Sequence, residues 1–352
     1  MNDHIRTTRP RVLPGLTVLR RRTGEVQFGL DPRHALVVGR LPEHLTRLTG
    51  RLRGDLTVAE LLAGAGEHAP LLDRLLDRLT HSGLLEDATP RAVPAHLAVD
   101  AATSALAAGR PSAPLHPGPR AAAAVRVVGD GRLAVAIGCL LAAAGVGRVE
   151  VTATGRVRPE DVGTGYLSDD VGRLRRSAAR AALHRVAVEA LTRIDLPRRP
   201  DLVVLSDAVV PAPEVVVPLF AERRSHLPVR VREGIGVVGP LVVPGRTSCL
   251  SCGDLHRCDR DPCWPALATQ LAGTVVPADL ATTQATAALA SAQVLAVLRW
   301  QHGGGGVPST WNTSVELDVV EASTRHRTWV PHPGCRCAAL RPGPDRVRHP
   351  RS

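Results

Sequence analysis

The chain has 352 residues, enough for two domains, and its 44 basic and 33 acidic side chains give a formal net charge of +11. It contains no lysine, and its arginines alternate with acids and are accompanied by one Tyr, two Phe and four Trp, whereas a nucleic-acid groove needs clustered cations and stacked aromatic rings. Because the N-terminus lacks the apolar core of a signal peptide and no run reaches the ~18 apolar residues of a membrane span, we expect a cytoplasmic protein that contacts neither membrane nor nucleic acid.

Residues 1–89 are predicted to form a small, winged-helix-like α+β domain. Two strands fit within residues 12–30, with a hairpin turn at Thr23-Gly24, and a third strand follows at residues 35–38. Three segments with helical spacing of leucines come next. A DNA-binding helix-turn-helix is an alternative, but the third helix balances its two arginines with two aspartates, which leaves little for base recognition.

This order of strands and helices resembles the PqqD-like peptide-recognition domain, known as the RiPP recognition element. In that family a leader peptide binds as an extra strand beside the third strand and against the third helix. The resemblance implies a peptide-binding edge at Ala35, Leu36, Val37 and Val38, faced by Leu72, Leu75, Leu76 and Leu79. Each of these positions also suits the domain's own core.

Residues 90–120 are rich in Pro, Ala and Ser and are predicted to link the first domain to a second one at residues 121–338. The second domain begins at residues 125–151 with a strand, a glycine turn, a long apolar helix and another strand. This order predicts the first βαβ unit of a doubly wound, mostly parallel, Rossmann-like α/β sheet. The three positions of the G-x-G-x-x-G/A fingerprint are occupied by Gly129, Gly131 and Ala134.

The glycine turn departs from a working nucleotide site. Phosphate binding needs bare backbone N–H groups at a helix N-terminus, and Asp130 and Arg132 bring side chains to this turn. The second strand would carry a ribose-binding acid at its end, but it ends in Thr152-Ala153-Thr154. The stretch therefore gives ATP binding little support.

Four cysteines form two close pairs far apart in the sequence. Cys249 and Cys252 make a C-x-x-C turn after an apolar strand that breaks at a Pro-Gly pair, and Cys335 and Cys337 follow about eighty residues later. In a reducing compartment such pairs are metal ligands more readily than disulfides. Four thiolates leave no open coordination position, which predicts a structural zinc site that contributes to folding rather than to catalysis.

The other cysteines have simpler interpretations. Cys258 and Cys263 lie near the first pair, but their spacing is poor for a second site, and we expect surface thiols. A thioester-forming catalytic cysteine is an alternative that would need a base such as His256 nearby. Cys139 falls within the apolar helix after the glycine turn and is predicted to be a core residue.

Over roughly residues 121–338 the sequence resembles the ThiF and ubiquitin-activating-enzyme superfamily. The matching stretches, in family order, are Gly131, residues 141–147, 170–172, 201–204 with Asp207, 240–252 and a late helix at 282–298. The resemblance implies a ThiF-type fold, a homodimer that packs through the late helix, and nucleotide contacts from Arg175 and Asp207. It also marks the nucleotide site as degenerate, because Ala153 replaces the family's ribose-binding Asp and Arg175 its Lys.

The surroundings of the cysteines are more distinctive. Cys249-x-x-Cys252-x-Asp254-x-His256 is followed by Asp261 and Trp264, and later by Trp329, His332 and the second cysteine pair. This pattern is similar to that of the ThiF-like leader-peptide-binding proteins of azol(in)e-containing peptide biosynthesis, also called bacteriocin-biosynthesis cyclodehydratase domains. Those proteins present a precursor peptide to a YcaO-type enzyme, where ATP-dependent activation lets a Cys, Ser or Thr side chain cyclise onto the preceding carbonyl. The resemblance implies a docking surface at Asp254, His256, Asp261 and Trp264.

We therefore predict a cytoplasmic scaffold with structural zinc that binds the leader of a ribosomally made precursor peptide and delivers it to a YcaO-type enzyme. No catalytic residue is assigned. The alternative is a divergent ThiF-like adenylyltransferase that activates a peptide or ubiquitin-like C-terminal carboxylate with ATP. Residues 339–352, rich in Pro and Arg, are predicted to be a disordered tail.

Overall fold

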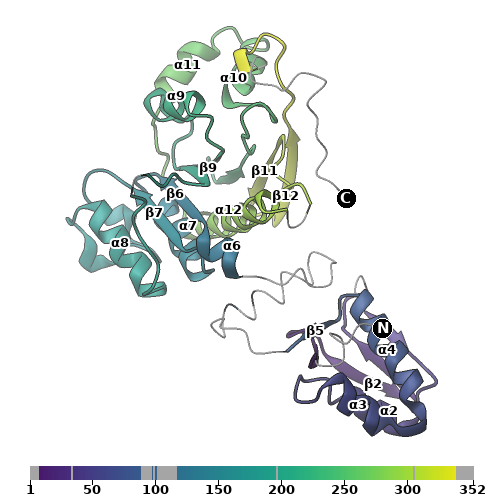
Figure 1. The fold of residues 1–352 in the computed structure, drawn as a ribbon. Helices are drawn as coiled ribbons and strands as arrows, with labels where there is room; N and C mark the ends of the chain where they lie inside the picture. The colour runs from purple at the N-terminus through teal and green to yellow at the C-terminus, as the bar shows by residue number, and fades with distance from the viewer. Residues whose placement is uncertain are drawn as a thin grey trace. The chain divides into compact units, whose positions relative to one another are not determined.

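The protein divides into two compact units, unit 1 (Met1–His116) and unit 2 (Pro117–Ser352), shown in Figure 1. The boundary falls within the predicted linker at 90–120. The computed structural model describes residues 8–32, 35–88, 97, 100, 117–195, 197–303 and 306–337. The predicted tail at 339–352 and most of the predicted linker lie outside the described residues.

In residues 8–88, apart from the undescribed 33–34, unit 1 contains two small sheets and three α-helices. Its strands are β1 (Pro10–Val12), β2 (Val18–Arg22), β3 (Glu25–Phe28), β4 (Leu36–Val38) and β5 (Leu85–Asp87). The helices are α2 (Glu43–Thr49), α3 (Val58–Ala65) and α4 (Ala69–His81), with a short 3₁₀ turn between the last two at Gly66–His68. β1 pairs with β5, while β2, β3 and β4 form an antiparallel sheet in that order, so β4 lies at its edge.

The predicted hairpin, third strand and three helices of unit 1 are all present. The hairpin turn holds Gly24 at φ 72°, in the left-handed region that glycine adopts without strain. α3 starts with a capping box, since Thr57 Oγ1 accepts from the Glu60 N–H and Glu60 Oε2 accepts from the Thr57 N–H. One core holds the unit together, and it includes Phe28, the helix leucines and the inward side chains of the strands.

Unit 2 is built on a seven-stranded mixed sheet. Its strands are β6 (Ala124–Val128), β7 (Arg148–Thr152), β8 (Leu202–Ser206), β9 (His226–Arg232), β10 (Ile235–Val238), β11 (Thr313–Asp318) and β12 (Ser323–Thr328). Across the sheet the order is β12-β11-β10-β9-β8-β6-β7. β7, β6, β8 and β9 are parallel to one another, and the pairs from β9 to β12 are antiparallel. The predicted α/β fold is therefore confirmed, with an antiparallel extension that carries the chain toward the second cysteine pair.

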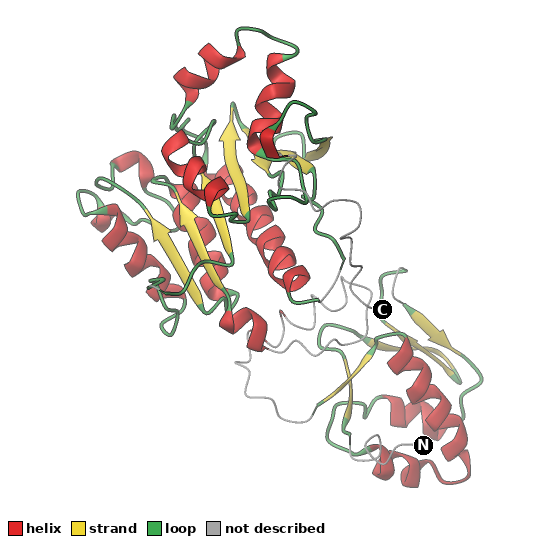
Figure 2. Ribbon diagram, turned by 45° about the horizontal axis from the view of Figure 1, so that its top comes forward, coloured by secondary structure: helices red, strands yellow, loops and turns green. Residues whose placement is uncertain are grey.

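The helices of unit 2 pack against the sheet and against one another (Figure 2). They are α6 (Pro117–Ala122), α7 (Arg132–Ala143), α8 (Arg175–Val186), α9 (Pro213–Ala221), α10 (Leu250–Cys258), α11 (Trp264–Leu271) and α12 (Leu280–Gln301). α7 and α12 pack side by side, with α12 against β9 and β10, and α8 packs on α7 and β7. The core between them consists of aliphatic side chains from the parallel strands and from the inner faces of α7, α8 and α12.

The strand order determines where the glycine turn lies in the fold. The chain leaves β6 through α7 to β7 and returns on the other side of β6 to β8, so the ends of β6 and β8 meet at a topological switch point. α12 corresponds to the predicted late helix; it is the only described helix long and apolar enough to cross a membrane, and 44% of its apolar window is buried inside the structure. Its N-cap is Asp279, whose carboxylate accepts from the Thr282 N–H at 2.8 Å.

Candidate functional site

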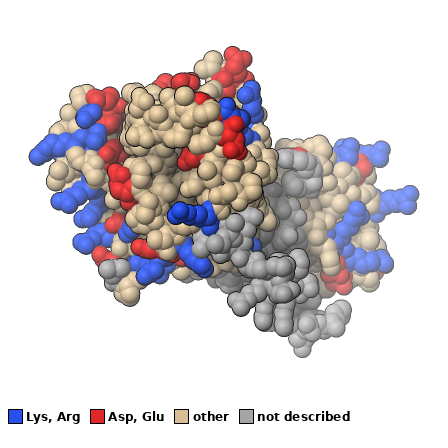
Figure 3. Space-filling model, turned by 90° about the horizontal axis from the view of Figure 1, so that it is seen from above, with Lys and Arg blue, Asp and Glu red and all other residues tan. Residues whose placement is uncertain are grey.

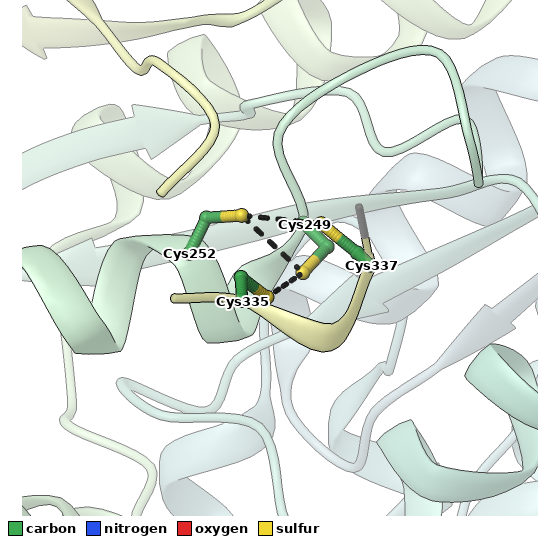
Figure 4. A group of neighbouring side chains, drawn as sticks. All are labelled: Cys249, Cys252, Cys335 and Cys337. Atoms are coloured by element: carbon green, nitrogen blue, oxygen red, sulfur yellow. Dashed lines mark hydrogen bonds between the residues drawn. The ribbon is translucent and has the colours of Figure 1, made fainter. Parts of the chain in front are cut away.

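The four predicted cysteine ligands lie together in unit 2, as Figure 4 shows. Cys249 is the N-cap of α10 and Cys252 lies in its first turn, while Cys335 and Cys337 come from the loop after β12. Their sulfurs approach one another at 3.7 Å (249 to 252), 3.6 Å (249 to 335) and 3.4 Å (252 to 337). All four side chains are buried.

This cluster has the chemistry and the dimensions of a zinc site. A tetrahedral ion with Zn–S bonds of about 2.3 Å places its sulfurs roughly 3.8 Å apart, close to the spacing found here. Burial raises the pKa of the Cys249 and Cys337 thiols, so without a metal these groups hold their protons. Zinc would displace those protons, and the four sulfurs would close its coordination shell without an open position.

A second group, His256, Asp259 and His332, ties the cysteine loop to α10. His332 Nδ1 accepts from the Gly334 N–H at 3.0 Å, so its Nε2 carries the proton and donates to Asp259 Oδ2 at 2.9 Å. His256 Nε2 lies 3.0 Å from the Val330 carbonyl oxygen, and its ring meets the His332 ring edge-on with centroids 4.8 Å apart. The potential ligand atoms of these three residues lie within 4.8 Å of one another, as in a metal site. Both ring nitrogens of His332, however, already take part in hydrogen bonds.

The residues predicted as a docking surface are engaged with their own neighbours. Asp254 Oδ1 accepts from Arg257 Nη1 at 2.9 Å and from Trp264 Nε1 at 3.0 Å. Asp261 Oδ1 accepts from the Cys263 N–H at 2.9 Å in the turn before α11. α9 and α11 bury none of their residues, and Figure 3 shows a largely uncharged surface where these helices lie.

The remaining cysteines show no sign of a second cluster among the described residues. Cys263 is exposed and Cys258 is partly buried, each with a free thiol. Cys139 packs against the main core, and burial raises the pKa of its thiol to about 11, which leaves it protonated at neutral pH.

At the switch point, Asp207 fills the glycine turn. Its carboxylate accepts from the Gly131 N–H at 3.0 Å and from Ser206 Oγ at 3.2 Å. A Cβ at Gly129 would lie 2.3 Å from Asp207 Oδ2, and one at Gly131 would lie 2.9 Å from Oδ1, so this close approach requires glycine at both positions. Ala134 is fully buried one turn into α7.

The conformation and environment of Asp207 are unusual for a carboxylate. Its φ of 74° lies in the left-handed region, which an Asp adopts more easily than most residues but still seldom. Burial raises its pKa to about 6, although the N–H of Gly131 and the hydroxyl of Ser206 act in the opposite direction. The helix N-terminus that would receive a phosphate is thus already occupied by a carboxylate of the chain.

Arg175, predicted as a phosphate contact, is also engaged. It is buried, and its Nε and Nη2 donate to Asp161 Oδ2 at 3.1 and 2.6 Å, while Nη1 reaches the Thr154 carbonyl oxygen at 3.3 Å. Asp130 accepts two hydrogen bonds from the backbone and side chain of Thr154. Ala153, in the ribose-acid position, is buried. Tyr166 lies nearby, fully buried, with a hydroxyl that has no partner among the described residues.

In unit 1 the predicted peptide-binding residues separate into two groups. Val37 is 37% exposed on the edge strand β4, while Leu36 and Val38 are partly buried against the core. The four predicted helix positions, Leu72, Leu75, Leu76 and Leu79, are buried in the core of unit 1. Ala35 comes just before β4. The helix leucines therefore have the packing of core residues, and β4 offers the free edge.

Sequence reasoning did not single out Asp161, Tyr166 or Arg230. Asp161 lies in a short 3₁₀ turn with no pattern that would connect it to Arg175. Tyr166 is the only tyrosine of the chain, which was a signal available in the composition. Arg230 lies between Val229 and Val231 in β9, and a charge between two apolar strand residues is a sequence signal for a buried polar contact.

No family model and no curated protein matches the sequence. Among solved structures, E. coli MccB with ATP is 15% identical with a TM-score of 0.69, and the match covers 93% of this chain and 99% of that chain. The chain has the MccB fold. The microcin C7 biosynthetic enzyme MccB in complex with N-formylated MccA is 16% identical (TM-score 0.67; 94% and 99% covered), and selenomethionine PaaA is 13% identical (0.65; 89% and 98%).

These matches extend beyond unit 2, since each covers a larger share of the chain than that unit contains. The shared fold agrees with the α/β architecture predicted for residues 121–338. Sequence identities this low establish the fold alone, so the function follows from the residues at the sites described above.

Proposed function

We propose that this protein is a cytoplasmic, zinc-stabilised scaffold that binds the leader of a ribosomally made precursor peptide and presents it to a YcaO-type enzyme for azoline formation. The proposal rests mainly on the glycine turn, where the polar groups that a nucleotide would contact are already hydrogen-bonded within the chain. Asp207 caps the Gly131 N–H, and Arg175 is paired with Asp161. MccB, whose fold the chain shares, has been solved with ATP and with the peptide MccA.

The edge of β4 is the proposed leader-binding site. β4 pairs with β3 on one side, and no described strand pairs with its other side. A leader peptide that adds there would gain main-chain hydrogen bonds, and its alternate side chains would supply specificity. Val37 would meet the peptide, while Leu36 and Val38 anchor the strand in the core.

The cysteine cluster has a structural role in this proposal. Zinc, when bound by Cys249, Cys252, Cys335 and Cys337, cross-links the start of α10 to the loop after β12. These segments are distant in the sequence, so the closure of a long loop stabilises unit 2 against unfolding. The ion would have no open position for substrate and no part in the chemistry, which the YcaO-type partner performs.

A charge on β4 provides the test. Val37→Lys should leave the fold intact because Val37 is exposed, and should weaken strand addition because charged edges oppose pairing. The matched control is Val320→Lys, at a position 88% exposed in a turn of unit 2. With a fluorescent leader of the precursor encoded beside the gene, we expect at least a tenfold loss of affinity for Val37→Lys and none for the control. Equal affinity for both variants would refute binding at β4.

An adenylyltransferase is the second candidate. It is favoured by the survival of the glycine turn and of Asp207 at the switch point, and by the ATP-bound structure of MccB. In this alternative, ATP and Mg²⁺ would draw Asp207 from the Gly131 N–H, and Arg175 would have to leave Asp161. Exchange of pyrophosphate into ATP would then accompany activation of a carboxyl terminus.

A further inference from the structure

The side of α10 that carries Cys249 and Cys252 continues into His256 and Asp259. These four positions are separated by three, four and three residues, so they follow one another along one side of the helix. Asp259 is the C-cap of α10. Beyond its two thiols, this side of the helix therefore presents an imidazole and a carboxylate to the segment that packs against it.

The loop after β12 contacts both parts of this side of α10. Its first residues meet the end of the helix: His256 Nε2 lies 3.0 Å from the Val330 carbonyl oxygen, and His332 Nε2 donates to Asp259 Oδ2 at 2.9 Å. The two cysteines of the loop then reach the two cysteines of the helix. The loop is thus joined to α10 by a set of hydrogen bonds next to the set of thiols.

His332 connects these two sets. Its backbone N–H donates to the Cys252 sulfur, and its carbonyl oxygen accepts from the Cys335 N–H at 3.1 Å. Its Nδ1 accepts from the Gly334 N–H at 3.0 Å, which leaves the ring proton on Nε2, directed at Asp259. The position of this one residue therefore determines where the backbone that carries the second cysteine pair lies.

The contact between His332 and Asp259 forms without a metal ion. The side chain of His332 is 13% exposed and that of Asp259 is 61% exposed, so a largely buried N–H donates to a carboxylate at the surface. Hydrogen bonds to a charged acceptor are stronger than those between neutral groups. In many zinc-binding segments the ligands take up their positions only when the metal binds, and part of the binding free energy is spent on ordering the chain.

We propose that His332 and Asp259 form a metal-independent latch, which holds residues 330–337 on α10 so that zinc binds four thiols already in position. The two latch residues act as positioning residues, because both ring nitrogens of His332 are engaged in hydrogen bonds. The inference goes beyond the proposed function, since it does not depend on the peptide. It rests on the cysteine cluster as the metal site, which metal analysis of the unmodified protein tests separately.

The zinc affinity of the full-length protein tests the latch. Competition with a chromophoric chelator gives the Kd for the unmodified protein, Asp259→Ala, His332→Ala and the double variant. We expect each single variant to bind zinc about tenfold more weakly, the lower end of the range for lost partners around a metal site. The double variant should bind no more weakly than His332→Ala, because both changes remove the same contact. Asp169→Ala, at an exposed aspartate, makes the same change of charge and should alter the Kd less than about twofold.

Thiol reactivity of the zinc-free protein shows whether the loop is held without metal. Alkylation by iodoacetamide followed by peptide mass spectrometry gives a rate for each cysteine. Cys335 and Cys337 are buried, and we expect them to react roughly fivefold faster or more in Asp259→Ala and in His332→Ala, because the loop then opens locally. Cys139, which packs against the main core, should react at the same rate in all variants.

Several results would overturn the latch. They are an unchanged zinc Kd in both single variants, effects that multiply in the double variant, and loop cysteines that react as fast in the unmodified zinc-free protein as in the variants. Faster alkylation of Cys139 as well would show that unit 2 loosens as a whole, which contradicts a local contact. Zinc binding that the variants leave unchanged would remove the latch and keep the zinc site. Protected loop cysteines in an unmodified protein that binds no zinc would remove the zinc site and keep the latch.

Discussion

The cysteine cluster and the glycine turn both lie in unit 2, but they are in different chemical states. The four sulfurs lie within 3.4 to 3.7 Å of one another along the cluster and could together hold one ion. At the glycine turn the chain has filled the site with its own Asp207, and Arg175 is neutralised by Asp161. The sulfurs are grouped so that one ion could contact all four, whereas the polar groups at the glycine turn are already bonded to other groups of the chain.

Loss of one cysteine should have the largest effect. Cys252→Ser removes a fully buried ligand, and we expect loss of zinc and a fall in melting temperature of more than about 10 °C, since structural zinc supplies several kcal/mol of folding free energy. Metal analysis and thermal unfolding of purified protein measure both. Cys263→Ser, at an exposed thiol, is the control and should keep the zinc. Full zinc occupancy in Cys252→Ser would show that the cluster is not the metal site.

Breaking the buried ion pair near the glycine turn is expected to have the second-largest effect. Asp161→Asn leaves Arg175 buried without its counter-ion, which should cost about 3–5 kcal/mol of unfolding free energy. Denaturant titration gives this value, and Glu160→Gln at the exposed neighbouring position should change it by less than about 0.5 kcal/mol. If Asp161→Asn were as stable as the control, Arg175 would be free to meet a phosphate, and the contrast between the two regions would weaken.

Asp207→Asn should change stability in the opposite direction. Because the folded-state pKa of about 6 lies above the usual value of 3.8, Asp207 favours the folded state at low pH and loses that contribution as the pH rises through 6. Asn accepts the same Gly131 N–H and tolerates positive φ, so the variant should be more stable by up to about 3 kcal/mol at pH 8 and equally stable below about pH 4. A destabilised variant at pH 8 would indicate that the charged carboxylate has a partner there.

The smallest expected effect concerns ATP. Since the donors of the turn are satisfied within the chain, Mg-ATP at millimolar concentration should shift the melting temperature by less than about 1 °C. Zinc added to metal-stripped protein should raise it substantially in the same assay. A large shift with Mg-ATP would show that the nucleotide site still binds its ligand.

The sequence predicted those parts of the molecule that depend on local patterns. The hairpin at Gly24, the glycine turn after β6, the late helix and the C-x-x-C turn each have short-range signals, and the order of motifs pointed to the α/β fold. Because a structural zinc site needs four ligands, the C-x-x-C turn at Cys249 and Cys252 needed two more thiolates, which Cys335 and Cys337 could supply. All of these features are present in the structure.

Other properties depend on which side chains meet across the fold, and no local pattern encodes that. Asp207 was noted as a strand-end carboxylate, but its approach to Gly129 and Gly131 depends on the packing of β6 beside β8. Asp254 and Trp264 were predicted to be available for docking, yet they bond to each other through the turn between α10 and α11. The leucines of α4 suit a groove and a core equally in sequence, and the fold buries them.

Pyrophosphate exchange into ATP tests the central claim most directly. The zinc-loaded protein, the precursor peptide, Mg-ATP and labelled pyrophosphate are combined, and peptide binding is measured in the same sample. A scaffold with a degenerate nucleotide site predicts bound peptide and no labelled ATP above the blank. Labelled ATP that appears only with the precursor and disappears in Asp207→Asn would contradict it, and would identify the protein as an adenylyltransferase.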